Sequence, residues 1–236
     1  MNKKFRVIVA DCPWSFQDSL KMSAVPRGAL ANYSTMTMQE IRELPVKAAC
    51  NPAGAVLCLW VPGSLLQDGL DTMKAWGFQH KQTYVWVKTK KQSLQGLKKI
   101  FTASAKNTFP QMGPKTITSM LSVAKAVVKF SIDNFNLENL LAFGMGRLFR
   151  QTHELCLIGT SNNEIYQHLK NKSQRSVCLA ENLGHSSKPE DLQDSLELMF
   201  PKARKLELFA RRLRPGWTCL GNEIDGKDIR DALAQL

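Results

Sequence analysis

The fold of this chain is set by the stretch Val7-Ile8-Val9-Ala10-Asp11-Cys12-Pro13-Trp14 near its start. Its first four residues are apolar, and a short unbroken apolar run predicts a strand that is buried on both faces. Asp11 and Pro13 follow at once, and these residue types favour a turn because proline cannot donate to the strand ladder. The sequence therefore begins with a buried strand that carries a polar turn at its carboxyl end.

The turn Asp11-Cys12-Pro13-Trp14 has the groups needed to act on an amino group attached to the ring of a base. Such an amine is a poor nucleophile because its lone pair is delocalised into the ring. The Asp11 carboxylate and the Cys12 carbonyl can accept its two N–H groups, which favours a pyramidal nitrogen and stabilises the positive charge that develops there. The Trp14 ring can stack on the base. The alternative is purely structural, with Pro13 anchoring a turn and Trp14 half-buried.

Strand-like and helix-like segments alternate along the rest of the chain. Apolar runs predict seven strands, at residues 5–10, 55–61, 83–87, 154–159, 176–180, 206–210 and 217–220. Capping residues and helical spacing predict helices at residues 37–44, 65–76, 189–199 and 225–236. This alternation predicts an α/β fold with a mostly parallel, doubly wound sheet.

Two segments interrupt the alternation. Residues 15–35 are polar and rich in Ser, Ala and Gly, and we expect them to form a mobile loop over the site. Residues 90–141 contain most of the lysines of a basic cluster and a predicted amphipathic helix at residues 116–130. We expect one domain over residues 1–236, with residues 90–141 inserted as a substrate-binding element.

The net charge of +12 comes almost entirely from one part of the chain. Between Asp71 and Asp133 the sequence has no Asp or Glu but contains 11 lysines, so 21 Lys and Arg (32 minus 11) face 20 Asp and Glu elsewhere. A positive field concentrated in this way favours a nucleic-acid partner. The alternative is a solvated surface, in which interspersed acids would be expected. We assign the nucleic-acid contact to Lys88, Lys90, Lys91, Lys98, Lys99, Lys106 and Lys115.

Cysteine and histidine usage predicts neither a disulfide framework nor a metal site. The six cysteines are scattered without a C-x-x-C pair, and several lie in apolar runs, as small core residues in a reducing compartment do. The four histidines lack the spacing of metal ligands. No apolar run is long enough to cross a membrane, and no signal peptide is visible, so we expect a cytoplasmic protein.

Seven further blocks follow the turn in a fixed order. Together with it they resemble the N(6)-adenine methyltransferases typified by the catalytic subunit of the eukaryotic messenger-RNA adenosine methyltransferase, and within them the bacterial and phage DNA-methylating branch. The resemblance spans residues 5–225 apart from residues 90–141. The blocks are Tyr33-Ser34-Thr35-Met36-Thr37, Leu59-Trp60-Val61 with Trp76-Gly77-Phe78, Val85-Trp86-Val87-Lys88, His153-Glu154-Leu155-Cys156-Leu157-Ile158-Gly159, Ser186-Ser187-Lys188-Pro189, Leu206-Glu207-Leu208-Phe209-Ala210-Arg211 and Leu220-Gly221-Asn222-Glu223.

The resemblance implies a Rossmann-like fold that uses S-adenosylmethionine, with the catalytic turn before the cofactor-binding half of the chain. Lys188 would meet the carboxylate of the cofactor, and Phe209 would pack near it. The family usually has proline where Cys12 stands, but the functional group there is the backbone carbonyl, so we expect activity to survive. The implied catalytic residues are Asp11, Cys12, Pro13 and Trp14, and the implied cofactor contacts are Ala10, Asp11, Lys188, Phe209, Arg211, Asn222 and Glu223.

The expected reaction is methylation of the N(6) amine of adenine in DNA, with the target base turned out of the helix into the pocket of the turn. The alternatives are the same reaction on RNA and a catalytically inactive nucleic-acid-binding subunit, against which the presence of Asp11 and Lys188 argues. A dinucleotide-dependent oxidoreductase would need a G-x-G-x-x-G after a strand, which the sequence lacks. The expected partner is nucleic acid, and the protein is expected to be a monomer or a homodimer without metal.

Overall fold

The computed structural model describes residues 4–15, 35–91, 125, 129, 138, 140–142, 144, 146, 148–182 and 187–236. The chain forms two compact units. The first unit comprises Met1–Trp86, Glu154–Cys178 and Glu190–Leu236, and the second comprises Val87–His153 and Leu179–Pro189. The predicted loop at residues 15–35 and the predicted helix at residues 116–130 lie almost wholly outside the described residues.

The seven predicted strands are all present, and they form one sheet of order β5-β3-β4-β2-β1-β6-β7. Strand β3 is longer than the predicted 83–87, because its first four residues are exposed and gave no apolar signal. The strands are β1 (Val7–Ala10), β2 (Val56–Val61), β3 (Gln79–Thr89), β4 (His153–Thr160), β5 (Val177–Glu181), β6 (Lys205–Leu208) and β7 (Trp217–Leu220).

Parallel pairing dominates the half of the sheet around β1. Strand β1 pairs in parallel with β2 and with β6, and β6 pairs in parallel with β7. Strand β2 pairs with β4 in the antiparallel sense, so the sheet is mixed. All four residues of β1 are buried, as expected for a strand with neighbours on both edges and helices on both faces. The predicted α/β class with a mostly parallel sheet is confirmed.

Local signals fix the helices of the N-terminal half. Helix α1 (Met38–Arg42) begins with a capping box, in which the side chains of Thr37 and Glu40 each accept the other's backbone N–H. The short helix α2 (Val46–Ala49) follows, and the 3-10 turn η2 (Gly63–Leu65) leads into α3 (Leu66–Ala75). Helix α3 ends before Gly77, whose φ of +83° is a conformation that favours glycine.

The C-terminal segment differs from its prediction. The single helix expected at residues 225–236 is instead two short helices, α7 (Asn222–Asp225) and α8 (Ile229–Ala234). Gly226 has a φ of +73° and ends α7, and the Asp228 side chain caps α8 by accepting the N–H of Arg230. Helix α6 (Asp191–Met199) is present, and it begins two residues later than predicted. The remaining element is the 3-10 helix η5 (Asn163–His168).

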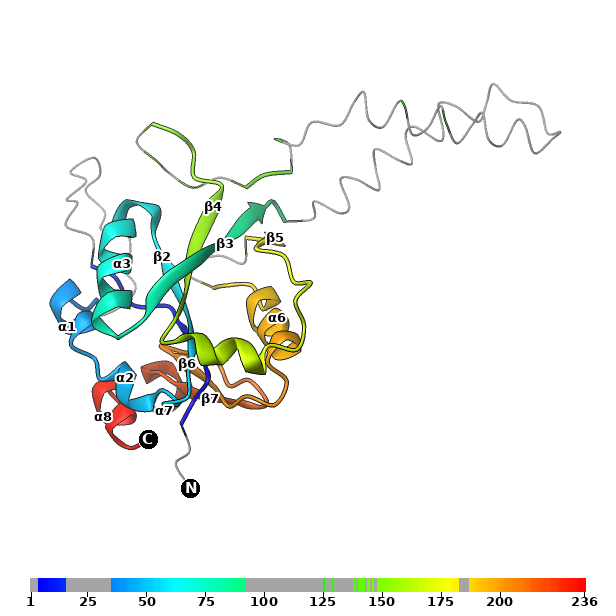
Figure 1. Cartoon of the computed structure of the whole chain (residues 1–236). Helices are drawn as coiled ribbons and strands as arrows, with labels where there is room; N and C mark the ends of the chain where they lie inside the picture. Colours follow the sequence, from blue (N-terminus) through cyan, green and yellow to red (C-terminus); the bar gives the residue numbers. More distant parts are fainter. Residues whose placement is uncertain are drawn as a thin grey trace, which may run out of the picture. The chain divides into compact units, whose positions relative to one another are not determined.

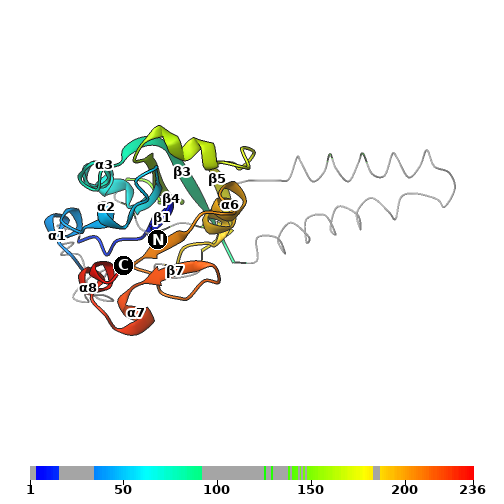
Figure 2. The same cartoon turned by 60° about the horizontal axis from the view of Figure 1, so that its bottom comes forward.

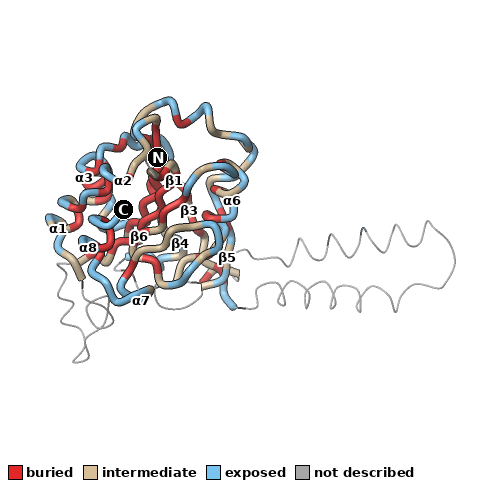
Figure 3. Tube along the Cα trace, turned by 90° about the horizontal axis from the view of Figure 1, so that it is seen from below, coloured by how far each residue is buried: buried red, intermediate tan, exposed pale blue. Residues whose placement is uncertain are grey.

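Helices cover both faces of the sheet in the first unit (Figures 1 and 2). On one face, Ile8, Leu57 and Leu206 of the strands pack with Met73 and Trp76 at α3 in a single core cluster. Helix α6 lies on the opposite face, and the buried residues concentrate along the strands between these layers (Figure 3). None of the helices in the described ranges is long and apolar enough to span a membrane. Side chains of α1, α2 and α8 that join the cluster are Ile41, Val46, Ile229 and Leu233.

The second unit is built around the end of β3. The N–H of Lys88 donates to Thr152 O at 2.8 Å, and the N–H of Ala142 donates to Lys88 O at 2.9 Å. Residues 88–90 are thus hydrogen-bonded on both sides, since the N–H of Asn182 also donates to Thr89 O at 2.9 Å. The described part of this unit is therefore held together mainly by strand-like backbone pairing.

Gly69 gives a test of how tightly α3 packs on the sheet. A Cβ at this position would lie 2.7 Å from Cγ2 of Val61 and 3.1 Å from Cδ1 of Leu157. Alanine is favoured over glycine in a helix interior by about 1 kcal/mol, but overpacking costs roughly 1–3 kcal/mol. We therefore expect Gly69→Ala to lower the free energy of unfolding, measured by urea denaturation. The exposed Gln67→Ala change in the same helix is the control, and a more stable Gly69→Ala protein would contradict the packing argument.

Candidate active site

Three adjacent parallel strands of the first unit end at the same level. Ala10 of β1 is opposite Leu208 of β6, and Leu208 is opposite Leu220 of β7. The residues that follow these ends therefore lie at one edge of the sheet, where ligands bind in open α/β sheets. This register brings together the predicted site residues Ala10, Asp11, Phe209, Arg211, Asn222 and Glu223.

Backbone hydrogen bonds shape the turn after β1. The N–H of Trp14 donates to Cys12 O at 2.9 Å, and the N–H of Met36 donates to Pro13 O at 3.0 Å. These bonds restrain the turn at a position where cysteine, unlike proline, does not fix φ. The Cys12 carbonyl already accepts one hydrogen bond and keeps a second lone pair for a further donor.

Trp14 is more deeply packed than the half-buried side chain that a structural role predicts. Its indole N–H donates to Trp60 O of β2 at 3.0 Å, and the residue is only 4% exposed within the hydrophobic core. A base could stack on this ring only after neighbouring residues move. Stacking on Trp14 therefore stays a prediction, while the structure shows that Trp14 anchors the turn to β2.

The thiol of Cys12 is held in its neutral form. Burial raises the pKa of this thiol well above its usual range, and the negative charge of Asp11 raises it further. The thiolate is the nucleophilic form of cysteine, so the thiol itself is unreactive here. Cys12 can thus contribute to the site through its backbone carbonyl alone.

Glu207 is a half-buried acidic residue of this edge to which the sequence analysis assigns no role. It lies on β6 opposite Val9, and it accepts a hydrogen bond from Gln193 of α6 at 3.1 Å. Burial raises the pKa of the Glu207 carboxyl, the Gln193 bond and the charge of Arg212 oppose the shift, and the charge of Asp11 adds to it. The signal in the sequence was an acid inside an apolar strand, which is a mark of functional sites.

The chain is conformationally constrained where it leaves β6. Phe209 has a φ of +58°, and it is the one non-glycine residue with positive φ in the described part of the chain. Such a backbone conformation is strained for a bulky residue and persists where the surroundings impose it. A Cβ on Gly221 would lie 2.3 Å from Ala210 O, so the ends of β6 and β7 approach more closely than any other residue at 221 would allow.

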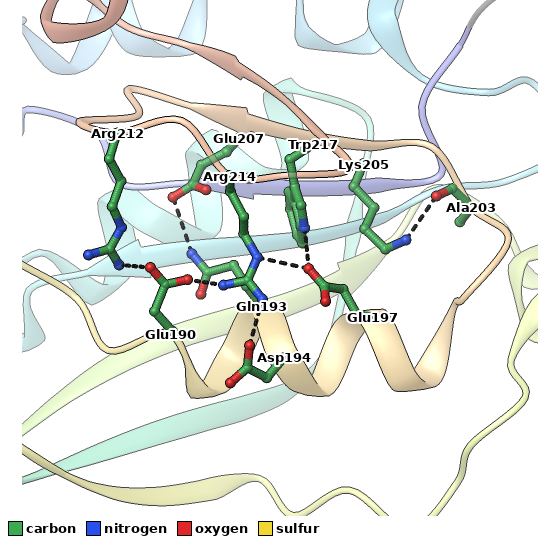
Figure 4. A network of polar contacts seen from close by, with 10 residues as sticks. All are labelled: Glu190, Gln193, Asp194, Glu197, Ala203, Lys205, Glu207, Arg212, Arg214 and Trp217. Carbon is green, nitrogen blue, oxygen red and sulfur yellow. Dashed lines mark hydrogen bonds and ion pairs between the residues drawn. The ribbon is translucent and has the colours of Figure 1, made fainter.

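Arg214, in the segment that follows β6, forms ion pairs with residues of helix α6 and its N-cap (Figure 4). The Arg214 guanidinium pairs with Glu190, with Asp194 at 2.5 Å and with Glu197 at 2.8 Å. The indole N–H of Trp217 donates to the same Glu197 oxygen at 2.7 Å. Because Arg214 is mostly buried and has several charged partners, this network holds residues 209–216 more firmly than an exposed ion pair would.

Polar groups project from the loops at this edge. Nε of Arg211 lies 3.7 Å from Oε1 of Glu223, which joins two of the predicted cofactor contacts, and Asn222 precedes Glu223 as the first residue of α7. Arg211, Asn222 and Glu223 thus offer a cation, an amide and a carboxylate at this edge. Within the described residues, no three His, Cys, Asp or Glu are grouped so as to hold a metal ion.

The other predicted site residues belong elsewhere. Lys188 is part of the second unit, so it is not among the residues that the strand register brings together. The second unit also contains Lys88, Lys90 and Lys91, of which the last two are exposed. Lys98, Lys99, Lys106 and Lys115 lie outside the described residues, and their assignment to nucleic acid stays a prediction.

Comparison with known proteins gives one family. The sequence model of the MT-A70 family matches residues 5–113 and 123–223. The N(6)-adenosine-methyltransferase MT-A70-like protein of Drosophila melanogaster is 26% identical over 231 residues, which cover 97% of this chain and 28% of that protein. The human N(6)-adenosine-methyltransferase catalytic subunit METTL3 is 25% identical over 231 residues, which cover 97% of this chain and 30% of that protein.

A bacterial relative matches over most of its own length. The Type II methyltransferase M.MunI of a Mycoplasma species is 22% identical over 242 residues, which cover 96% of this chain and 81% of that protein. By contrast, the chain spans less than a third of the length of the adenosine methyltransferases that it matches.

The raised pKa of Glu207 predicts a pH-dependent effect of Glu207→Gln on stability. The folded protein binds this proton more tightly than the unfolded chain does, so its stabilising contribution is complete at low pH and is lost as the pH rises through the raised pKa. Glutamine cannot ionise and can still accept from Gln193. At about pH 7.5 we expect the melting temperature of the variant to be higher than that of the wild type. This difference in melting temperature should shrink as the pH falls towards about pH 4.

Thermal unfolding at several pH values measures this difference. Glu43→Gln, which removes an exposed carboxylate beside α1, is the control for the loss of a surface charge. An offset between Glu207→Gln and the wild type that stays constant over the whole pH range would contradict the assignment.

Proposed function

Because the chain belongs to the MT-A70 family, we propose that it transfers a methyl group from S-adenosylmethionine to the N(6) amine of an adenine in nucleic acid. The observation that carries this proposal is the register of β1, β6 and β7, which puts Asp11 at the same edge as Phe209 and Gly221. The relatives named above support it, since both the adenosine enzymes and M.MunI are methyltransferases by name.

The groups at this edge fit S-adenosylmethionine. Its ribose hydroxyls and adenine call for hydrogen-bond donors and acceptors, which Arg211, Asn222 and Glu223 provide beside the strand ends. The close approach of Gly221 to Ala210 fixes the loop from which these side chains project. We infer that Phe209 packs near the cofactor and that Lys188 binds its carboxylate. When bound, this cofactor supplies an electrophilic methyl group on a sulfonium.

The turn after β1 would orient and activate the adenine amine. Asp11 and the second lone pair of the Cys12 carbonyl accept its two N–H groups, which directs the nitrogen lone pair out of the ring plane. The charge of Asp11 stabilises the positive charge that develops on the nitrogen. The bonds from Trp14 to Cys12 and Trp60 hold this turn in place before the substrate arrives, so little reorganisation is needed.

We infer that the nucleic acid is DNA. The bacterial relative M.MunI, a Type II methyltransferase by name, aligns with this chain over 81% of its own length. This agrees with its resemblance to the bacterial and phage branch of the family, whose members methylate DNA. An adenine in duplex DNA is paired and stacked, so it has to leave the helix before its amine can react.

Substitution of Asp11 tests the catalytic assignment. We expect Asp11→Ala to reduce methyl incorporation from radiolabelled S-adenosylmethionine by about 100-fold or more, the scale of losing one preorganised hydrogen-bonding group at a reacting centre. Titration calorimetry with the cofactor separates lost binding from lost chemistry, and Glu43→Gln is the matched control. Near-normal incorporation by Asp11→Ala would defeat the assignment, and a wild type that binds no cofactor would favour an inactive nucleic-acid-binding subunit.

Matched oligonucleotides decide between DNA and RNA. DNA and RNA strands of the same adenine-containing sequences, single-stranded and duplex, are compared as methyl acceptors for the wild-type protein. We expect higher incorporation into DNA, because the chain resembles the DNA-methylating branch. Higher incorporation into RNA would overturn the inferred substrate and leave the proposed chemistry intact.

A further inference from the structure

A short hairpin of the second unit exposes two large apolar side chains. Gly144 and Gln151 form an antiparallel bridge, in which the N–H of Gly144 donates to Gln151 O at 2.7 Å and the N–H of Gln151 donates to Gly144 O at 3.2 Å. Leu148 and Phe149 between them are 92% and 87% exposed, more than any other large hydrophobic residue among those the structure describes. We call residues 144–151 the hairpin.

Gly146 lies close to the backbone of Phe149. A Cβ on Gly146 would lie only 2.1 Å from Phe149 O, so the backbone closes on itself where only glycine fits. Phe149 is thus restrained by this close backbone approach, and the bridge between Gly144 and Gln151 lies beside it in the chain. The exposure of two large apolar side chains to water costs free energy, and a binding partner that covers them would remove this cost.

The charge of the second unit indicates the kind of partner. By sequence, the second unit contains 12 Lys and Arg against 3 Asp and Glu, a net charge of +9 out of the total of +12. Lys90, Lys91 and Arg150 are exposed members of this set. An excess of positive charge with an exposed aromatic ring is the combination that binds a nucleic-acid backbone and contacts its bases.

The size of the tip argues against a protein partner. A stable protein interface buries about 1,200–2,000 Å² in total, which two side chains on a narrow hairpin cannot supply. By contrast, single apolar side chains such as Phe and Leu are the wedges that proteins insert between base steps to unstack and kink a duplex. The tip matches such a wedge in the type and number of its apolar residues, and the unit that contains it is positively charged.

We propose that Leu148 and Phe149 form a wedge that enters the base stack of duplex DNA and helps to extrude the target adenine. The proposal rests on the proposed function and deepens it, because a base has to leave the helix before its amine can react. The wedge lowers the cost of unstacking, while the lysines and arginines of the second unit bind the phosphates. A substrate that is already single-stranded needs the wedge much less.

The test compares duplex and denatured DNA as substrates for a double variant, Leu148→Ala with Phe149→Ala. Sheared genomic DNA is used, native or heat-denatured, because it offers every short recognition sequence. We expect methyl incorporation from radiolabelled S-adenosylmethionine into native DNA to fall roughly ten-fold, as for loss of a stacking contact, with incorporation into denatured DNA close to wild type. Leu198→Ala, at a 57% exposed position of α6, is the matched control and should change neither.

The other outcomes of this experiment contradict the proposed wedge. An equal loss on native and denatured DNA would make the tip a general contact, and an unchanged rate on native DNA would give it no role. The oligomeric state of the wild type and the variant is measured by sedimentation. A wild-type dimer that the double substitution converts to a monomer would assign the tip to self-association.

A second measurement separates failure of the wedge from failure of the proposed function. If the wild type methylates neither form of DNA, the proposed function on DNA fails, and the wedge is judged by the fluorescence of 2-aminopurine placed in a synthetic duplex. Binding of the wild type should raise this fluorescence by unstacking the probe, and binding of the double variant should not. The absence of a rise with the wild type, or an equal rise with both proteins, overturns the wedge.

Discussion

The buried position of β1 between two parallel neighbours is the constraint on which the rest of the first unit depends. All four of its residues are buried, and its last residue, Ala10, is level with Leu59 of β2 and Leu208 of β6. A shift of one residue in either direction would bring a charged flanking residue, Arg6 or Asp11, into the buried segment, which costs free energy. This cost opposes such a shift, so Asp11 is held at the level where β6 and β7 also end.

The candidate site combines a fixed backbone with acids in different surroundings. The turn after β1 is held by its own hydrogen bonds and by the indole of Trp14 on Trp60, and the segment after β6 is held by Arg214 on α6. Burial keeps the thiol of Cys12 neutral and raises the pKa of Glu207. A transfer reaction is faster when the groups of the site are fixed before the substrate binds. The reacting atoms are then already oriented, and no free energy is needed to order the site.

Charge is divided unequally between the two units. The first unit contains the carboxyl ends of β1, β6 and β7 with a nearly balanced set of charged residues, whereas the second has most of the net positive charge and the exposed tip of the hairpin. The proposed function would use this division, with the second set of residues binding a polyanion and the first acting on a base. The MT-A70 match spans both units, so the division lies within the family region.

The sequence by itself determined the strands and helices whose signals are local. Apolar runs located all seven strands, and Thr37 with Glu40 located the start of α1, because periodicity and capping involve residues that are close in the chain. Gly226 was also a local signal, but the prediction placed it inside a single helix at residues 225–236 and so missed the break. Only the tertiary structure decided that Trp14 donates to Trp60, that Gln193 bonds to Glu207 and that Arg214 meets three carboxylates of the α6 segment. These contacts join residues that are far apart in sequence or depend on the exact direction of a side chain, and both are fixed only when the sheet register brings the elements together.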